Sequence, residues 1–267
     1  DAKYSAERER SVGLGVMGFH SFLQKKGVPF ESVMANAWNK RIFSSIKEQA
    51  DSASIKLAEE KGACPDAKEY GVKERFSNKI AVAPTASISI ICGGASPGIE
   101  PIAANSFTQK TLSGSFNVKN RNLKELLMKK GKDTEEVWSS ITINKGSVQH
   151  LDFLSENEKA TFKTAFEIDQ RRVIELAADR TPFVCQSQSL NIFLRPDVHK
   201  RDLHKIHYTA WKKGVKSLYY LRSLSIQRAE VVSHNKKSSS IPIKGKINSG
   251  ENPTENELNY DECLSCQ

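Results

Sequence analysis

SLNIFLRPDVHKRDLHKIHYTAWKKGVKSLYYLR, residues 189–222, contains two apolar segments on either side of an amphipathic one. The apolar segments, residues 189–194 and 215–222, have the composition of strands. Residues 201–213 have helical periodicity, and Gly214 follows as a helix stop. Two strands joined through one helix form a βαβ unit, whose strands are parallel. This stretch therefore predicts an α/β fold.

Two more helices are expected upstream of this unit. Residues 31–61 carry apolar side chains every four positions, and Gly62 follows them. Residues 155–180 begin with Ser155 and Glu158 in the spacing of a capping box. The sequence therefore predicts one long helix over each range.

The composition of the 267-residue chain indicates one folded body and a polar extension. Hydrophobic residues make up 38% of the chain. From residue 233 onward the sequence is polar and rich in Gly, Pro and Ser, and such a segment buries too little apolar surface to offset its ordering entropy. We expect a folded α/β domain over residues 1–232 and a flexible, disordered tail over residues 233–267.

Composition also argues against several classes of protein. No apolar run approaches the roughly 18 residues of a membrane span, and no signal peptide precedes the charged start. We therefore expect a soluble, cytoplasmic protein with no membrane partner. Five cysteines, an odd and scattered set, do not resemble a secreted disulfide framework. The formal charge of +9 fits a phosphate-bearing ligand or a merely solvated surface, and we expect no direct contact with nucleic acid.

The tail ends in a CxxC pair, Cys263 and Cys266. Three uses are considered for it: zinc ligation, thiol–disulfide exchange, or none. A structural zinc site needs four ligands, and no second spaced pair completes one. A thioredoxin-type site needs a strand-to-helix junction around the pair, which the polar tail does not offer. Exchange by a mobile dithiol is the use that remains, and no metal site is expected.

The small hydroxyl-bearing residues 83–89 follow an apolar segment, residues 79–84, that is typical of a strand entering a loop. If a helix starts here, its free backbone N–H groups form an anion site. Thr and Ser are also common as ordinary helix N-caps. A phosphate site and a plain cap both fit the pattern. The glycine-rich residues 93–101 follow, and they either line a pocket or form a tight connection.

Two further patterns are weaker. Residues 13–18 match GxGxxG, but the preceding residues are charged rather than strand-like, and no acid lies about twenty residues downstream, so a dinucleotide site is not expected. His204 and His207 have helical spacing without a further ligand, which is more typical of a solvated face than of a metal site. We expect the glycines to allow close packing and the two histidines to lie on a solvated helix face.

Tyr219 and Tyr220 are adjacent within an expected strand, so their side chains should point to opposite faces. One ring would then belong to the core and the other to the opposite face. A pair of phenols can also pass an electron and a proton between sites, and periodicity does not select between these roles.

Taken together, the motifs resemble those of the class I ribonucleoside-diphosphate reductase large subunit, in its C-terminal portion. They occur in family order: RSVGLGVMGFH (10–20), ACP (63–65), APTAS (83–87), GIEP (98–101), LSG (112–114), QSQSLN (186–191), SLYYLR (217–222) and the terminal CxxC. The resemblance implies the C-terminal half of the family's ten-stranded α/β barrel, followed by a disordered tail.

The resemblance also implies roles for particular residues. Pro84, Thr85, Ala86, Ser87 and Ile88 match the loop that holds the phosphates of the nucleoside diphosphate, mainly through backbone N–H groups and the Ser87 hydroxyl. In the same family, Tyr219 and Tyr220 match tandem tyrosines that relay a radical, with Tyr220 nearer the small subunit. Cys263 and Cys266 match the dithiol that re-reduces the active-site disulfide.

These roles imply partners. They are a small, metal-containing subunit that generates the radical, thioredoxin or glutaredoxin, and a ribonucleoside diphosphate substrate; no cofactor is expected in this chain. The family's radical-bearing cysteine and buried redox pair match nothing here, so an N-terminal fragment of the large subunit is expected in trans, in the cytoplasm or, for a viral chain, the host cytoplasm.

Two alternatives stay open beside this one. The first is a non-catalytic remnant or a redox-binding module that uses only its tail. The second is a cobalamin-dependent reductase, which can also carry a C-terminal dithiol. Tyr219 and Tyr220 argue against the second, because an enzyme that makes its radical locally needs no relay.

Overall fold

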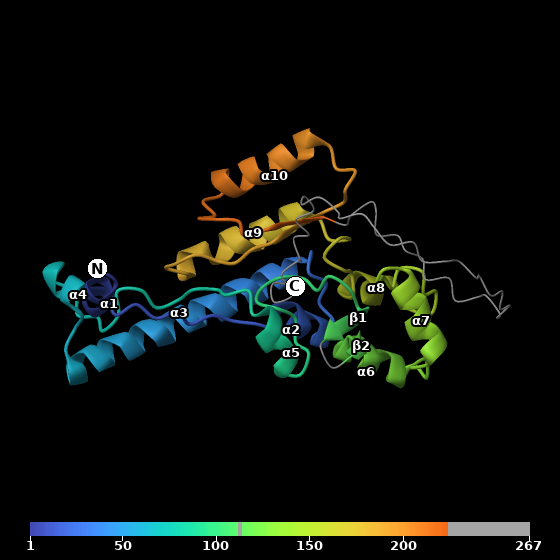
Figure 1. Ribbon diagram of the computed structural model, residues 1–267, viewed down its shortest axis with the longest axis horizontal. Coiled ribbons are helices and arrows are strands. Elements are labelled where there is room, and N and C mark those ends of the chain that lie inside the picture. Colours follow the sequence, from blue (N-terminus) through green and yellow to red (C-terminus); the bar gives the residue numbers. More distant parts are fainter. Residues whose placement is uncertain (112–113, 224–267) are drawn as a thin grey trace, which may run out of the picture.

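The computed structural model describes residues 1–111 and 114–223, which form helices packed around short parallel strand segments (Figure 1). The elements in chain order are α1 (Ala2–Glu9), α2 (Phe19–Lys25), α3 (Val33–Lys61), α4 (Pro65–Glu69), α5 (Ala86–Ile91), β1 (Ser106–Thr111), β2 (Gly114–Lys119), α6 (Arg121–Lys129), α7 (Glu135–Ile143), α8 (Glu156–Thr161), α9 (Gln170–Arg180), the 3-10 turn η1 (Thr181–Phe183), β3 (Ile192–Leu194), α10 (Lys200–Lys212) and β4 (Leu221–Ser223). The α/β class predicted from the sequence is confirmed.

Four extended segments lie side by side and connect regions far apart in the sequence. Residues 12–14 bond to residues 78–81, and Leu14 and Ile80 form a parallel bridge. Val82 and Gln188 form the next parallel bridge, and β3 pairs with β4 in parallel register. The segment 186–192 thus has a neighbour on each side, because alternate residues of an extended chain direct their backbone groups to opposite sides.

The βαβ unit is confirmed in type, but its second strand is shorter than predicted. Strand β4 begins at Leu221, six residues after the expected start. Residues 215–218 do not pair as a strand because they close the end of α10 and cross the core: Val215 N–H donates to the Ala210 carbonyl at 3.0 Å, and the Val215 and Leu218 side chains pack against buried residues. The first strand is likewise limited to Ile192–Leu194.

The long helix predicted over residues 31–61 is confirmed as α3. The Ser32 hydroxyl caps its start by accepting from Ala35 N–H at 3.2 Å, and Gly62, with a φ of 80°, ends it. Helix α3 packs against α9, and α9 packs against α10, so the three helices form successive layers (Figure 1). Their shared faces form the main apolar core together with the strand segments.

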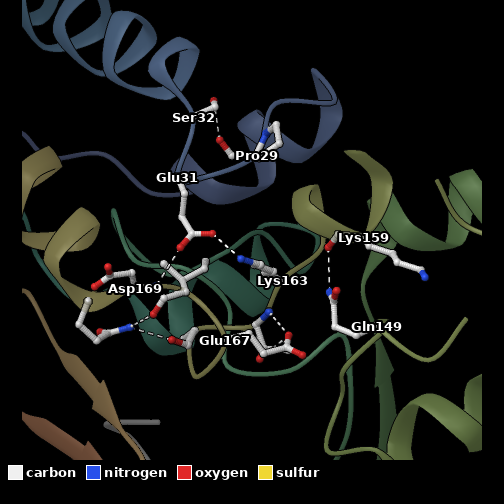
Figure 2. Close-up of polar contacts among 12 residues, drawn as sticks. Pro29, Glu31, Ser32, Gln149, Lys159, Lys163, Glu167 and Asp169 are labelled. Atoms are coloured by element: carbon white, nitrogen blue, oxygen red, sulfur yellow. Dashed lines mark hydrogen bonds and ion pairs between the residues drawn. The ribbon is translucent and has the colours of Figure 1, made fainter. Parts of the chain in front are cut away.

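The single helix predicted over residues 155–180 is wrong, because the chain is divided into α8 and α9. The capping box between Ser155 and Glu158 is present at the start of α8. Residues 162–169 then turn around Glu31, whose carboxylate accepts from Asp169 N–H at 2.9 Å and pairs with Lys163 at 2.6 Å (Figure 2). Asp169 caps α9 by accepting from Arg171 N–H. A partner more than 130 residues upstream therefore interrupts the helix.

The glycines of the GxGxxG pattern serve close packing. A Cβ atom on Gly15 would lie 2.5 Å from the Ala81 carbonyl oxygen, so the first two extended segments approach each other more closely than a side chain allows. Gly18 starts α2 with a φ of 80°. In this chain the glycines thus allow two extended segments to lie close together and α2 to begin at a positive φ.

A second, smaller apolar cluster lies at the other end of the molecule. Leu123 and Leu127 of α6 pack with Trp138 and Ile141 of α7 beside the β1–β2 hairpin (Figure 1). None of the helices in residues 1–111 and 114–223 combines the length and apolar character needed to cross a bilayer. The predicted tail, residues 233–267, lies outside the described residues.

His20 on α2 generates a prediction about pH. Its ring is fully buried, Nδ1 accepts from Ile102 N–H at 3.1 Å, and burial lowers the pKa of His20 to about 4 although a bond to the Thr161 backbone acts in the opposite direction. The unfolded chain binds the proton near pH 6.5 and the folded chain does not. The contribution of His20 to the free energy of unfolding is therefore fully present above pH 6.5. It is lost as the pH falls toward 4, by up to about 3 kcal/mol.

Denaturant unfolding between pH 7 and 4.5 measures this effect. The variant His20→Asn keeps an acceptor for Ile102 N–H but cannot titrate, so its unfolding free energy should fall less steeply over that range. The exposed His150 provides the control His150→Asn, which should keep the wild-type slope. Equal slopes in wild type and His20→Asn would contradict the prediction.

Candidate functional site

A hollow of about 210 Å³ lies where the extended segments meet the start of α5. It is lined by residues 84–88, by Asn191 and by Tyr219. The structure therefore brings the predicted phosphate loop next to one of the two predicted relay tyrosines, although more than 130 positions separate them in the sequence.

The loop reaches the hollow through a turn at Thr85. Thr85 adopts the left-handed conformation, with a φ of 54°, and α5 begins at the next residue. Its hydroxyl does not cap the helix but accepts from Gly98 N–H at 2.8 Å. The first N–H groups of a helix have no partner within the helix, so this turn aims backbone donors at the hollow.

Loop 93–101 contacts the predicted phosphate loop, residues 84–88. Gly98 has a φ of 47°, and a Cβ atom there would lie 3.0 Å from the Ala83 carbonyl oxygen. Ile99 and Glu100 follow and are buried. Of the two roles considered for this loop, the tight connection is the one these contacts describe.

Glu100 connects that loop to the strands. Its carboxylate accepts from Asn191 N–H at 2.6 Å and from Asn191 Nδ2 at 3.1 Å. Burial raises the pKa of Glu100, while the Asn191 donors and the charge of Arg222 act against that shift. Asn191 in turn accepts from Tyr220 N–H through Oδ1 at 3.0 Å.

The two tyrosine rings lie together, so the expectation that they occupy opposite faces is wrong. Their centroids are 4.2 Å apart with an interplanar angle of 54°, and the two residues are 48% and 44% exposed. Alternation fails because β4 begins only after Tyr220, at Leu221. Tyr219 lines the hollow, and neither residue belongs to the core.

The other candidates do not form a site. His199 caps α10 by accepting from Arg201 N–H, and His204 stacks on Tyr208. Within the part of the chain that the structure describes, no group of three or more His, Cys, Asp or Glu residues could hold a metal ion. Cys263 and Cys266 lie outside the described residues.

Comparison with known proteins decides the family. The family profile described as "Ribonucleotide reductase, barrel domain" matches residues 1–70 and 65–221. The chain belongs to the ribonucleotide reductase family. The half-barrel expectation agrees with this match and with the parallel segments described above.

Individual relatives support the same family assignment. The ribonucleoside-diphosphate reductase large subunit of Invertebrate iridescent virus 6 is 51% identical over 241 residues, which are 89% of this chain and 25% of the relative. The putative large subunit of Frog virus 3 is 41% identical over 98% of this chain and 43% of the relative. The chain thus spans between a quarter and less than half of these relatives.

A solved structure gives the same result for the fold. The class Id ribonucleotide reductase alpha subunit of Actinobacillus ureae superposes with a TM-score of 0.76 at 42% identity, over 83% of this chain and 40% of that one. The sequence match to the barrel domain and the structural match to an alpha subunit therefore agree.

Sequence reasoning did not assign Glu100 or Asn191 to the site. Each lies in a motif that carried the resemblance, yet their contact joins positions 91 apart in the sequence. An acid placed directly before a proline in a glycine-rich loop was the available signal, and it does not identify a partner.

Gly98 provides a test of this geometry. The substitution Gly98→Ala adds the strain of a positive φ, about 1 kcal/mol or more, and a contact with the Ala83 carbonyl oxygen. Gly27 also has a positive φ, 65°, but nothing within 4 Å of its Cβ position. Gly98→Ala should lower the free energy of unfolding more than Gly27→Ala, and equal losses would mean that the loop does not press on residue 83.

Proposed function

We propose that this chain forms part of a class I ribonucleoside-diphosphate reductase large subunit. In this role it takes part in the radical reduction of ribonucleoside diphosphates to 2'-deoxyribonucleoside diphosphates, which supply DNA synthesis. The observation that carries the proposal is the hollow itself, because the phosphate loop and the ring of Tyr219 line one space.

The loop at residues 84–88 would hold the substrate's phosphates. Backbone donors at a helix start attract anions through direct hydrogen bonds. In this reading Ala86, Ser87 and Ile88 supply N–H groups and Ser87 adds its hydroxyl. Thr85 has the positioning role, since its own hydroxyl is engaged by Gly98.

The tyrosine pair would relay the radical. A neutral phenol, with a pKa of about 10, can lose an electron and a proton together and avoid a charged intermediate. The ring centroids, 4.2 Å apart, allow direct transfer between the two residues. Tyr219 lines the hollow, which agrees with an order in which Tyr220 receives the radical from the small subunit and Tyr219 passes it toward the substrate.

Cys263 and Cys266 would act as the shuttle dithiol. One thiolate attacks a sulfur of the active-site disulfide, and the second closes a new disulfide in the tail while the target is released as two thiols. Thioredoxin or glutaredoxin then reduces the tail. Asp261 and Glu262 beside the pair favour the neutral thiol in solution, so reactivity would rise where the pair docks.

The remaining parts of the reaction are assigned to partners. We propose that an N-terminal fragment of the large subunit joins this chain in trans and supplies the radical-bearing cysteine and the buried redox pair. The metal belongs to the small subunit, and the assembly acts in the cytoplasm or, for a viral chain, in that of the host.

The rival function is a non-catalytic remnant or a redox-binding module that uses only its tail. It requires neither the hollow nor the tyrosine contact. An assembly that binds thioredoxin but does not reduce ribonucleoside diphosphates would favour it.

Two variants separate the proposed roles. In the assembled enzyme, Tyr219→Phe should abolish turnover with every reductant, because phenylalanine cannot carry the radical. The double variant Cys263→Ser, Cys266→Ser should lose turnover with thioredoxin but keep it with dithiothreitol, which reaches the active site directly. Product formation from a ribonucleoside diphosphate under each reductant is the measurement.

Tyr70→Phe serves as the control, because Tyr70 is 84% exposed at the end of α4, and α4 lies far from α5 in the fold (Figure 1). It should behave as wild type with both reductants. If the tyrosine and cysteine variants failed alike with dithiothreitol, the assigned roles would be wrong.

A further inference from the structure

Glu100 and Asn191 form a hydrogen-bonded chain with a fixed direction. Both carboxylate oxygens of Glu100 accept from Asn191, Oε1 from the backbone N–H at 2.6 Å and Oε2 from Nδ2 at 3.1 Å. The amide oxygen Oδ1 of Asn191 is thereby turned to Tyr220, whose N–H donates to it at 3.0 Å. Glu100 and Asn191 are 6% and 4% exposed, so water does not compete freely for these bonds.

The direction of this chain depends on the carboxylate. An ionised carboxylate only accepts hydrogen bonds, whereas a carboxamide has one accepting and one donating end. Because Glu100 accepts on both oxygens, the NH2 group of Asn191 must face it and the amide oxygen must face Tyr220. Turning the Asn191 amide over would set its NH2 group against the Tyr220 N–H, and the hydrogen bond between them would be lost.

The same contacts place the tyrosines. Tyr219 N–H donates to the Leu190 carbonyl, and Ile192 N–H donates to the Tyr220 carbonyl, each at 2.9 Å. These two backbone bonds continue the β3–β4 pairing upstream of Leu221, whereas the bond from Tyr220 N–H goes to the Asn191 side chain. It is the contact through which a residue outside the ladder can set the position of Tyr220.

The loop that carries Glu100 also reaches the phosphate loop. Two residues before it, Gly98 N–H donates to the Thr85 hydroxyl. One short loop therefore bonds to both sides of the hollow, with a backbone donor toward Thr85 and a carboxylate toward Asn191. A displacement of this loop would move both sides together.

We propose that Glu100 is a positioning residue for the Tyr219–Tyr220 pair. By fixing the orientation of the Asn191 amide, it holds the backbone of Tyr220 and so keeps the two rings in contact at the edge of the hollow. The geometric part of the inference stands on the contacts alone, and its consequence for turnover rests on the proposed function.

An exchange of the two functional groups tests this inference. Glu100→Gln can satisfy only one of the two Asn191 donors, and Asn191→Asp sets two carboxylates against each other. In the double variant the introduced glutamine donates to the introduced aspartate, which keeps an oxygen facing Tyr220 N–H. The pattern of donors and acceptors is then complete again, with the negative charge moved from position 100 to position 191.

Amide hydrogen exchange in the assembled full chain is the first readout. Loss of the hydrogen bond to Asn191 should speed exchange at Tyr220 by roughly tenfold or more in each single variant, and the double variant should return to within about threefold of wild type. Glu31→Gln is the matched control, because Glu31 also accepts a backbone N–H and lies in a different part of the fold. It should leave exchange at Tyr220 unchanged.

Turnover is the second readout. Glu100→Gln should lower kcat by about tenfold or more while the KM for the ribonucleoside diphosphate changes little, and the double variant should recover kcat. Asn191→Asp should also lower kcat, but it places a carboxylate at the edge of the hollow, so its KM is not used as a readout. Unchanged exchange at Tyr220 in Glu100→Gln, or a double variant as impaired as the worse single one, would overturn the inference. An inactive wild-type assembly would contradict the proposed function, and the exchange experiment would still decide the positioning role.

Discussion

The segment 186–192 bonds to a neighbouring extended segment on each side, and the rest of the site depends on this constraint. On one side Val82 N–H donates to the Ser187 carbonyl and Ser189 N–H to the Val82 carbonyl, which holds the strand that leads into the phosphate loop. On the other side Leu190 and Ile192 hold Tyr219 and Tyr220. The two lining elements of the hollow are thus fixed to one backbone.

Local signals were sufficient for the parts of the fold whose partners lie nearby. The periodicity of residues 31–61, with the glycine that follows, predicts α3 with an error of two residues at its start. The βαβ unit follows in the same way, since its helix and strands are consecutive. The interruption between α8 and α9 depends on Glu31, which no window around residues 162–169 contains. The long-range contacts of the Glu31 carboxylate therefore set the helix boundary that local propensity does not define.

The site was predictable to a similar degree. Motif resemblance named the phosphate loop and both tyrosines, and the structure places Tyr219 against the loop. Strand alternation gave the wrong arrangement of the rings, because β4 begins at Leu221, after both tyrosines. Glu100 and Asn191 carry no local pattern that pairs them. Their contact exists only after the loop and the strand ladder have formed.

The central claim is that these elements serve one reaction in a reductase large subunit. The direct test combines this chain with an N-terminal portion of the large subunit, the small subunit and thioredoxin, and measures deoxyribonucleoside diphosphate formed from the ribonucleoside diphosphate. The account predicts product that requires this chain and disappears when it is omitted. Stable assembly of all components without product would contradict it.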